Sequence, residues 1–220
     1  MNVSAIIFDF DGVLIESEHV SAGQIAATLS MLGHPTTVEQ ALDAFTGLGG
    51  KDFLDAVAAY TGAGVPDGFV EARRAEDARV MAEGVGEVAG SVDFVRGLPA
   101  DFPIAVASSS TTSWLRAHLD HLGLRERFEP HIYSGREHVS RGKPAPDLYL
   151  YAAAQLGVPI EQCAILEDSV VGVIGALASG ARTIGFAAGK HCRHGHADRL
   201  RERGVTNIAH SFAEVAALLA

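Results

Sequence analysis

The chain has 220 residues, of which 17 are Lys or Arg and 27 are Asp or Glu, so its formal net charge at pH 7 is −10. That acidic balance argues against a broad binding surface for nucleic acid or for anionic lipid. Hydrophobic residues make up 48% of the chain and charged residues 20%, which is enough apolar material for a folded core. The length fits one substantial domain with a smaller insertion.

The sequence also indicates where the protein works. Its two cysteines, Cys163 and Cys192, are too few for a disulfide framework and fit a reducing compartment. The N-terminus lacks the basic start and the apolar length of a signal peptide, and apolar runs are too short to span a bilayer. We therefore expect a cytoplasmic protein without membrane or nucleic-acid partners, as a monomer or a weak homo-oligomer.

In chain order, a short apolar strand over residues 3–8 is followed by a block with no convincing strand. The periodicity of that block predicts four helices, and two overlapping capping-box patterns, Thr36-x-x-Glu39 and Thr37-x-x-Gln40, precede the second. We expect residues 16–84 to form a small all-helical domain inserted after the first strand. Its helices are predicted at Val20–Leu32, Val38–Phe45, Phe53–Tyr60 and Gly68–Met81, with Gly33, Gly47 and Gly62 in the gaps.

Beyond residue 84, short apolar runs rich in β-branched residues alternate with segments of helical period, which is typical of βαβ units. We therefore expect an α/β fold, in which residues 1–15 and 85–220 form a doubly wound, Rossmann-like parallel-sheet core. Strands are predicted at Val3–Phe8, Ile104–Ala107, Ile132–Tyr133, Ala164–Leu166, Thr183–Phe186 and Asn207–Ala209. Helices are predicted at Trp114–Leu122, Leu148–Leu156, Val170–Ala178 and Ala197–Arg203, and several end at a glycine, namely Gly123, Gly157, Gly180 and Gly204.

Two aspartates follow the first strand, in the sequence Phe8-Asp9-Phe10-Asp11-Gly12. Open parallel sheets bind ligands at the carboxyl ends of their strands. One carboxylate placed there can attack phosphorus as a nucleophile, and a second can act as a general acid. An ordinary turn after the strand is the alternative interpretation of the Asp-Gly pair.

Two further motifs, a run of serines and a lysine before a proline, carry side chains that can bind anions. Ser108, Ser109 and Ser110 end an apolar strand at the start of a helix, where hydroxyls and backbone N–H groups bind phosphate; N-capping explains them as well. Lys143 precedes Pro144, which favours an extended backbone at the lysine. A lysine held in this way can offset phosphate charge, and a solvated loop lysine is the alternative.

A second acidic pair, Glu167 and Asp168, closes a later buried strand. Mg²⁺ prefers such oxygen ligands, although Asp168 could also cap the next helix. In one parallel sheet both acidic pairs converge at the same edge. Crowded carboxylates repel by roughly several kcal/mol at an effective dielectric of about 20 unless a cation lies among them. The sequence therefore predicts a bound metal ion.

The ordered set of motifs, from Asp9 to Asp168, resembles the haloacid dehalogenase superfamily, in its branch of phosphatases and phosphomutases with a helical cap. The whole chain fits the plan of that family. The resemblance implies a Mg²⁺-dependent phosphatase that hydrolyses a small phosphorylated metabolite, such as a sugar phosphate or a sugar acid phosphate, through an aspartyl-phosphate.

The same resemblance assigns catalytic roles. Asp9 attacks phosphorus, and Asp11 protonates the leaving alcohol and later activates water. Ser108 and Lys143 hold the phosphoryl group, with Ser109 as a further candidate for phosphate binding. These roles agree with the physical requirements of phosphoryl transfer, which depends mainly on positioning and on neutralised charge.

The metal ligands implied by the resemblance come from both acidic pairs. Asp168, one oxygen of Asp9 and the backbone carbonyl of Asp11 would bind Mg²⁺. Glu167 would be either a direct ligand or a ligand through water.

Three other classes of protein share parts of this pattern. A hexose-phosphate mutase similar to β-phosphoglucomutase is the nearest, but such enzymes carry a histidine in the first cap helix, where this chain has Ser21 with His19 nearby. Phosphonoacetaldehyde hydrolases use a cap lysine, for which Lys51 could be mistaken, yet they usually replace the acid that is retained here as Asp11. Signalling receiver domains are much shorter and have no helical insert.

The expected cap contains candidates for contact with the substrate. These are Glu16 and Lys51, with Arg73 and Arg74 as additional residues; solvated helix faces are the alternative.

The segment from Lys190 to His196 has residue types that suit zinc, but it lacks a second ligand pair at standard spacing. We expect it to be a loop at the rim of the site or simply a basic loop.

Overall fold

The structure is a computed structural model that describes residues 3–46, 48 and 50–220. The chain separates into two compact units, Met1–Glu16 with Gly86–Ala220 and Ser17–Val85. We call the first the sheet unit and the second the helical unit. Glu16, expected in the helical insert, belongs to the sheet unit, where its backbone N–H donates to the Gly86 carbonyl at 3.0 Å.

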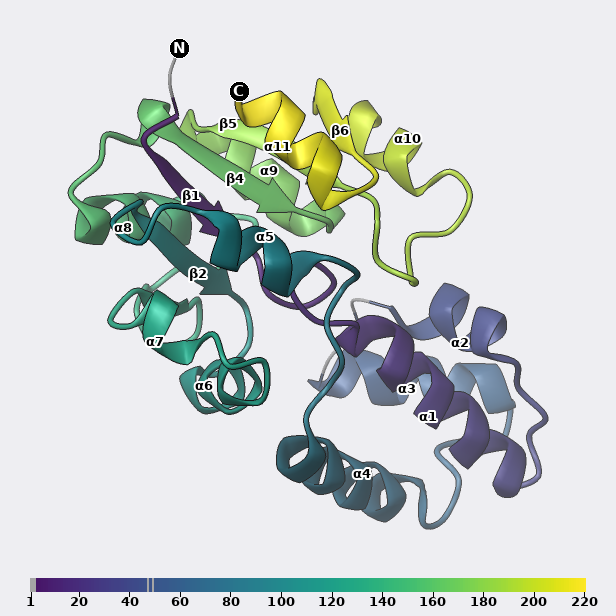
Figure 1. The fold of residues 1–220 in the computed structure, drawn as a ribbon. Coiled ribbons are helices and arrows are strands. Elements are labelled where there is room, and N and C mark those ends of the chain that lie inside the picture. Colours follow the sequence, from purple (N-terminus) through teal and green to yellow (C-terminus); the bar gives the residue numbers. More distant parts are fainter. Residues whose placement is uncertain (1–2, 47, 49) are drawn as a thin grey trace. The chain divides into compact units, whose positions relative to one another are not determined.

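The sheet unit is built on six parallel strands in the order β3-β2-β1-β4-β5-β6 (Figure 1). This arrangement confirms the predicted α/β fold. All six strands were predictable as apolar runs, and each differs from its expected range by at most a few terminal residues. They are β1 (Ala5–Phe8), β2 (Ile104–Ser108), β3 (Ile132–Ser134), β4 (Cys163–Glu167), β5 (Arg182–Phe186) and β6 (Asn207–Ala209).

Helices connect these strands and cover the sheet (Figure 1). Four predicted helices are confirmed: α6 (Thr112–His121), α8 (Asp147–Leu156), α9 (Val170–Ser179) and α10 (His196–Glu202). Four elements were not predicted: α5 (Ser91–Gly97), α7 (Arg125–Phe128), the 3-10 helix η1 (Ile160–Gln162) and α11 (Phe212–Leu219). Most of these are too short for a helical period to be visible in the sequence. The four glycines predicted to end helices all have positive φ.

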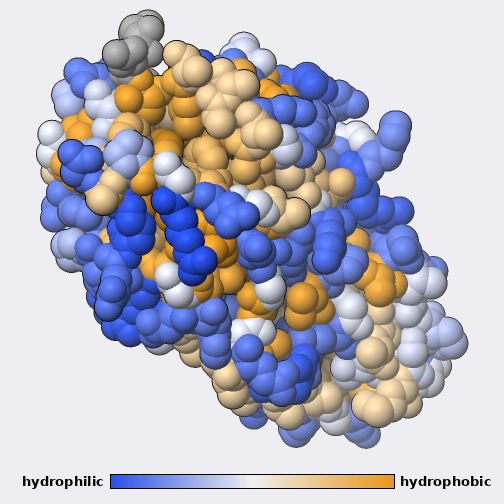
Figure 2. Space-filling model, in the orientation of Figure 1, coloured by the Kyte–Doolittle hydropathy of each residue, from blue (hydrophilic) through white to orange (hydrophobic). Residues whose placement is uncertain are grey.

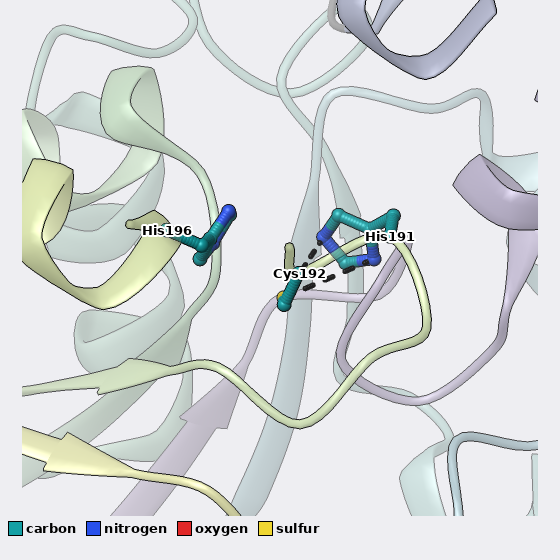
Figure 3. A group of neighbouring side chains, drawn as sticks. All are labelled: His191, Cys192 and His196. Atoms are coloured by element: carbon teal, nitrogen blue, oxygen red, sulfur yellow. Dashed lines mark hydrogen bonds between the residues drawn. The ribbon is translucent and has the colours of Figure 1, made fainter. Parts of the chain in front are cut away.

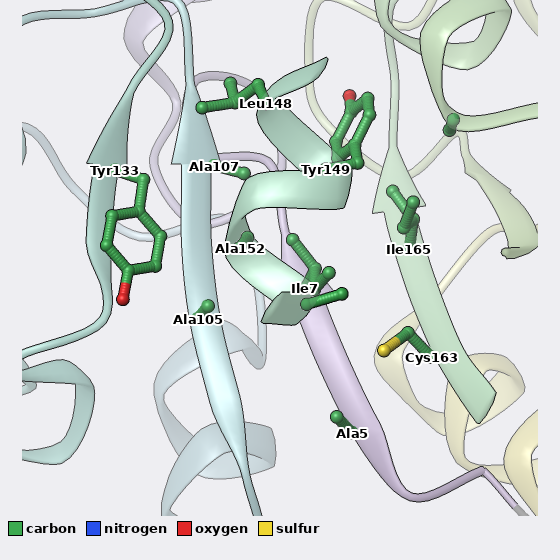
Figure 4. Close-up of a cluster of buried hydrophobic side chains, with 12 residues drawn as sticks. Ala5, Ile7, Ala105, Ala107, Tyr133, Leu148, Tyr149, Ala152, Cys163 and Ile165 are labelled. Carbon is green, nitrogen blue, oxygen red and sulfur yellow. The ribbon is translucent and has the colours of Figure 1, made fainter. Parts of the chain in front are cut away.

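Alternate residues of β1 pack on opposite faces of the sheet, as the two-residue period of a strand requires. Ile7 lies in an apolar cluster with Tyr149 of α8 (Figure 4). Phe8 faces the other side, where its ring centroid is 6.1 Å from that of Phe94 in α5 and 5.7 Å from that of Phe128 in α7. Because both faces of the sheet are covered at β1, every residue of this strand is apolar. Each large apolar side chain buried in this way stabilises the fold by about 1.5–3 kcal/mol.

The register of the central strands positions the polar residues that follow them. Phe8 of β1 pairs with Leu166 of β4, so Asp9 and Glu167 come level at the carboxyl edge of the sheet. The Asp9 N–H donates to the Leu166 carbonyl at 2.9 Å. Ser108 ends the neighbouring strand β2. The sheet therefore gathers residues that are far apart in the sequence at one edge, as expected for a parallel arrangement.

The described part of the helical unit contains the four predicted helices, packed around apolar residues that include Leu29 and Phe45. The second begins with a capping box, in which the Thr37 side chain accepts from the Gln40 N–H and the Gln40 side chain accepts from the Thr37 N–H. Gly47, expected between two helices, lies outside the described residues. The helices are α1 (Ser17–Met31), α2 (Val38–Phe45), α3 (Gly50–Thr61) and α4 (Phe69–Glu83).

Apolar residues also reach the surface of the sheet unit. Figure 2 shows them gathered over α11, with hydrophilic residues around them. On α8 and α9, the exposed large apolar side chains are Leu150, Val171 and Ile174. Within the described residues, no helix combines the length and the apolar character needed to cross a membrane.

Candidate active site

Lys143 links two carboxylates at the carboxyl edge of the sheet. Its Nζ lies 2.5 Å from Oδ1 of Asp9 and 2.7 Å from Oε2 of Glu167, and its side chain is only 4% exposed. Burial opposes the positive charge, but the two adjacent carboxylates outweigh it and raise the pKa of Lys143 well above its usual range. Lys143 is therefore a buried, protonated cation between Asp9 and Glu167.

Glu167 uses both of its carboxylate oxygens for hydrogen bonds. Oε2 accepts from Lys143 and from the Tyr149 hydroxyl at 2.6 Å. Oε1 accepts from the Ser169 N–H at 2.9 Å and from the Ser169 hydroxyl at 2.7 Å. Burial alone would raise the pKa of Glu167, but Lys143 and the other donors lower it. These contacts suit a carboxylate that holds Lys143 in place, and a direct bond to a metal ion would displace at least one of them.

Asp9 is buried beside this pair, with 6% of its surface exposed. Burial and the neighbouring Glu167 raise the pKa of Asp9 well above its usual range, although Lys143 acts in the opposite direction. A carboxylate must be ionised to attack phosphorus. A further positive charge near Asp9 would therefore favour the reactive form.

Asp11 is held by donors from the segment between the end of β2 and the first turn of α6. Its Oδ2 accepts from the Ser110 hydroxyl at 2.6 Å and lies 3.4 Å from the Ser108 hydroxyl. Its Oδ1 accepts from Nε1–H of Trp114 at 3.2 Å. Ser109, predicted to bind phosphate, is exposed next to these groups. Trp114 was not predictable as a partner of Asp11, because the two residues lie far apart along the chain.

Asp168 completes a buried acidic cluster with Asp9 and Glu167, in which one carboxylate oxygen of each residue lies within 4.8 Å of the others. Oδ1 of Asp168 is buried and has no hydrogen-bond partner among the described residues. Burial raises the pKa of Asp168, despite the opposing effect of His191. A buried set of carboxylates with an unpartnered oxygen fits a divalent cation with oxygen ligands, such as Mg²⁺.

The segment before α10 also belongs to this site, which corrects the expectation of a simple basic loop. Nε2 of His191 lies 2.8 Å from Oδ2 of Asp168, and His191 is buried. Burial alone would lower the pKa of His191, but the bond to Asp168 and the neighbouring Cys192 raise it to about 11. Ligand atoms of His191, Cys192 and His196 lie within 4.8 Å of one another (Figure 3).

The two candidates for substrate contact lie in different units. Glu16 of the sheet unit is buried, and its Oε2 accepts from the Lys190 N–H at 2.9 Å. Lys51 of α3 has a side chain that is 83% exposed and forms an ion pair with Asp55. Glu16 thus has a structural partner inside its own unit, whereas Lys51 lies on a solvated helix face.

Carboxylates and a lysine gathered at the carboxyl edge of a parallel sheet define an α/β enzyme site. Residues 3–180 match the sequence model of the haloacid dehalogenase-like hydrolases. The chain belongs to this family and is a hydrolase.

Individual relatives are similar over most of the chain. The fructose-1-phosphate phosphatase YqaB of Escherichia coli is 29% identical over 177 residues, which cover 80% of this chain and 93% of that protein. The 6-phosphogluconate phosphatase of the same organism is 25% identical over 190 residues, covering 86% and 85%. A crystal structure of a haloacid dehalogenase family hydrolase from Deinococcus radiodurans, with bound phosphate and sodium, has a TM-score of 0.87 and 34% identity, covering 99% and 95%.

Proposed function

We propose that the protein is a phosphatase that hydrolyses the phosphate monoester of a small sugar or sugar acid. The observation that carries this proposal is the contact of Lys143 with both Asp9 and Glu167, beside the unpartnered oxygen of Asp168. In this contact the Asp9 carboxylate, which can attack phosphorus, lies next to the Lys143 ammonium group, which can bind phosphoryl oxygens. The phosphatase names of the two bacterial relatives support the same reaction class.

In the proposed reaction, an Asp9 oxygen attacks phosphorus, the P–O bond of the ester breaks, and the leaving oxygen takes the proton of Asp11. Water then attacks the phosphorus of the aspartyl-phosphate and gives a proton to Asp11. This step releases inorganic phosphate and restores the Asp9 carboxylate. Lys143 and the Ser108 hydroxyl would hold the phosphoryl oxygens, with Ser109 as a further contact.

We propose Mg²⁺ as the cofactor. Asp9 and Asp168 would bind it through carboxylate oxygens, together with the carbonyl of Asp11, and Glu167 would contribute through water or after losing one of its present contacts. When bound, Mg²⁺ would offset the negative charge of the transferring phosphoryl group. The same charge would lower the pKa of Asp9 and favour its ionised form.

The helical unit is proposed to be the cap domain, and Lys51 remains its candidate for substrate contact. We place the protein in the cytoplasm, because Cys163 and Cys192 are both free thiols. The substrate itself is proposed only as a class, since the two relatives act on different phosphorylated compounds.

The test is release of inorganic phosphate from a panel of phosphorylated sugars and sugar acids, including fructose 1-phosphate and 6-phosphogluconate. We expect many turnovers with Mg²⁺, none in excess chelator, and recovery when Mg²⁺ is restored. Full activity in chelator would contradict the metal requirement. β-Glucose 1-phosphate should yield free phosphate; conversion to glucose 6-phosphate without phosphate release would instead identify a mutase.

A further inference from the structure

One loop brings two histidines to Asp168. Nε2 of His191 lies 2.8 Å from Oδ2 of Asp168, and Nε2 of His196 donates to the Asp168 backbone carbonyl at 2.8 Å. Figure 3 shows both rings together with Cys192, which contacts His191. The proposed reaction uses none of these three side chains, although they surround a proposed metal ligand.

The fold leaves a dedicated space for the His191 ring, whose side chain is 3% exposed. Gly12 has a φ of +82°, and a Cβ atom on it would lie 2.2 Å from Oδ2 of Asp168 and 2.7 Å from Cε1 of His191. A Cβ atom on Gly189 would lie 2.7 Å from two atoms of the same ring. These distances are too short for non-bonded atoms, so neither glycine can carry a side chain while the ring keeps its place.

A buried carboxylate fixes the backbone next to the ring. Oε2 of Glu16 accepts from the Lys190 N–H at 2.9 Å, and the Cys192 N–H donates to the Gly189 carbonyl at 2.8 Å. These bonds hold the residues on both sides of His191. The position of the imidazole is therefore set by the tertiary structure of the sheet unit and not by a solvated loop.

We propose that His191 is a positioning residue of the metal site. By donating a hydrogen bond to Oδ2 of Asp168, it fixes the rotation of that carboxylate and leaves Oδ1 as the oxygen that binds the cation. Oδ1 is the buried atom that has no partner within the described residues. His196 holds the backbone of the same residue. This inference rests on the proposed function, because it requires Asp168 to be a metal ligand.

A zinc site formed by His191, Cys192 and His196 is the competing interpretation, since the three offer ligand atoms close together. Zinc needs ring nitrogens that carry no proton. Nε2 of each ring faces an oxygen atom of Asp168, to which it can bond only as a donor, so only Nδ1 could bind zinc. Nδ1 of His196 already accepts from the guanidinium of Arg199 at 3.3 Å. The observed hydrogen bonds therefore favour a positioning role over zinc ligation.

The test is the dissociation constant of Mg²⁺, measured by isothermal titration calorimetry on metal-free protein at one fixed pH and without substrate. His191→Phe fills the space of the ring without a donor, whereas His191→Gln keeps an N–H donor of similar reach. We expect His191→Phe to weaken Mg²⁺ binding about 10- to 100-fold. His191→Gln should recover most of the affinity. The same two substitutions at His194, an exposed residue of the loop, should leave the constant unchanged.

Thermal unfolding of each metal-free variant identifies those that fold, and His191→Leu replaces His191→Phe if the latter does not. Mg²⁺ binding by a folded, donor-free variant that is as tight as in the wild type, or tighter, overturns the proposal. A tight Zn²⁺ site that Cys192→Ser removes would overturn it as well, because the imidazole would then be a ligand. If the wild-type protein binds no Mg²⁺, the proposed cofactor fails and this inference fails with it.

Discussion

The indole of Trp114 donates a hydrogen bond to the carboxylate of Asp11, with Nε1 3.2 Å from Oδ1. Trp114 lies in the first turn of α6, where its own N–H donates to the side chain of the N-cap residue Thr111. Its ring lies against that of His118, with centroids 3.9 Å apart and the ring planes tilted by 36°. Because Ser110 donates to the other oxygen of Asp11, the segment that leads from β2 into the first turn of α6 orients both oxygens of the proposed general acid.

Trp114→Phe tests this relationship, because it removes the donor and keeps an aromatic ring against His118. Hydrogen bonds to charged groups contribute about 1.5–3 kcal/mol. We expect kcat to fall about 10- to 100-fold with little change in KM, since the loss affects the orientation of Asp11 more than substrate binding. Steady-state kinetics on the best substrate measure both constants. An unchanged kcat in a folded variant would show that the indole does not position Asp11.

Lys143→Met should destabilise the metal-free protein as well as abolish activity. The substitution leaves Asp9 and Glu167 buried without their shared cation, which costs about 3–5 kcal/mol for a broken buried ion pair. Urea denaturation measures the free energy of unfolding. Lys51→Met is the matched control, because that side chain is exposed, and it should change stability by less than about 0.5 kcal/mol. Equal stability of both variants would contradict the structural role of Lys143.

His118 should make the protein less stable in mild acid. The residue is buried, its Nε2 has no partner among the described residues, and burial lowers its pKa. The unfolded chain binds a proton at this histidine below about pH 6.5, while the folded protein binds it only at lower pH. The unfolded state therefore holds more protons in this range, and the free energy of unfolding falls as the pH falls.

The check on His118 is the free energy of unfolding in urea, measured from about pH 8 to about pH 5. His118→Phe cannot bind the proton and keeps a ring against Trp114. Its stability should depend less on pH than that of the wild type. If the free energy of unfolding changed with pH equally in the wild type and in His118→Phe, His118 would not be the source of the acid sensitivity.

The two cysteines should differ in reactivity. Cys163 is buried at the start of β4, and burial raises its pKa to about 11, whereas Cys192 is half-buried. The thiolate is the form that attacks thiol reagents, so at about pH 8 the native protein should react rapidly at Cys192 alone. Unfolding should expose both thiols. Cys192→Ser should remove the rapid phase and Cys163→Ser should not; two rapid thiols in the native protein would contradict the burial of Cys163.

The strands and the acidic residues at their ends were predictable because both depend on local sequence. An apolar run of four residues before Asp9, and another before Glu167, marks a buried strand and also marks where it ends. A parallel sheet then brings those ends together without further information. Lys143 could be named as a candidate for this site because a proline follows it and because it fits the pattern of the family.

The partners that hold these residues were not predictable in the same way. Tyr149 follows the period of an apolar helix face, and nothing local shows that its hydroxyl reaches Glu167. In the sequence, His191 belongs to a polar loop, yet its ring is buried against Asp168. The ring fits there because Gly12 and Gly189, which are far apart in the chain, have no side chains. Such contacts depend on tertiary packing, which overrides what a loop composition suggests.

Attack of Asp9 on phosphorus is the central claim, and a single-turnover experiment tests it most directly. Enzyme in excess over substrate is quenched in acid within the first turnover, digested, and examined by mass spectrometry for a phosphorylated peptide that contains Asp9. We predict that the phosphorylated peptide forms and decays at rates that account for phosphate release, and that Asp9→Asn forms none and releases no phosphate. Phosphate release at the wild-type rate from a folded Asp9→Asn variant would contradict the mechanism.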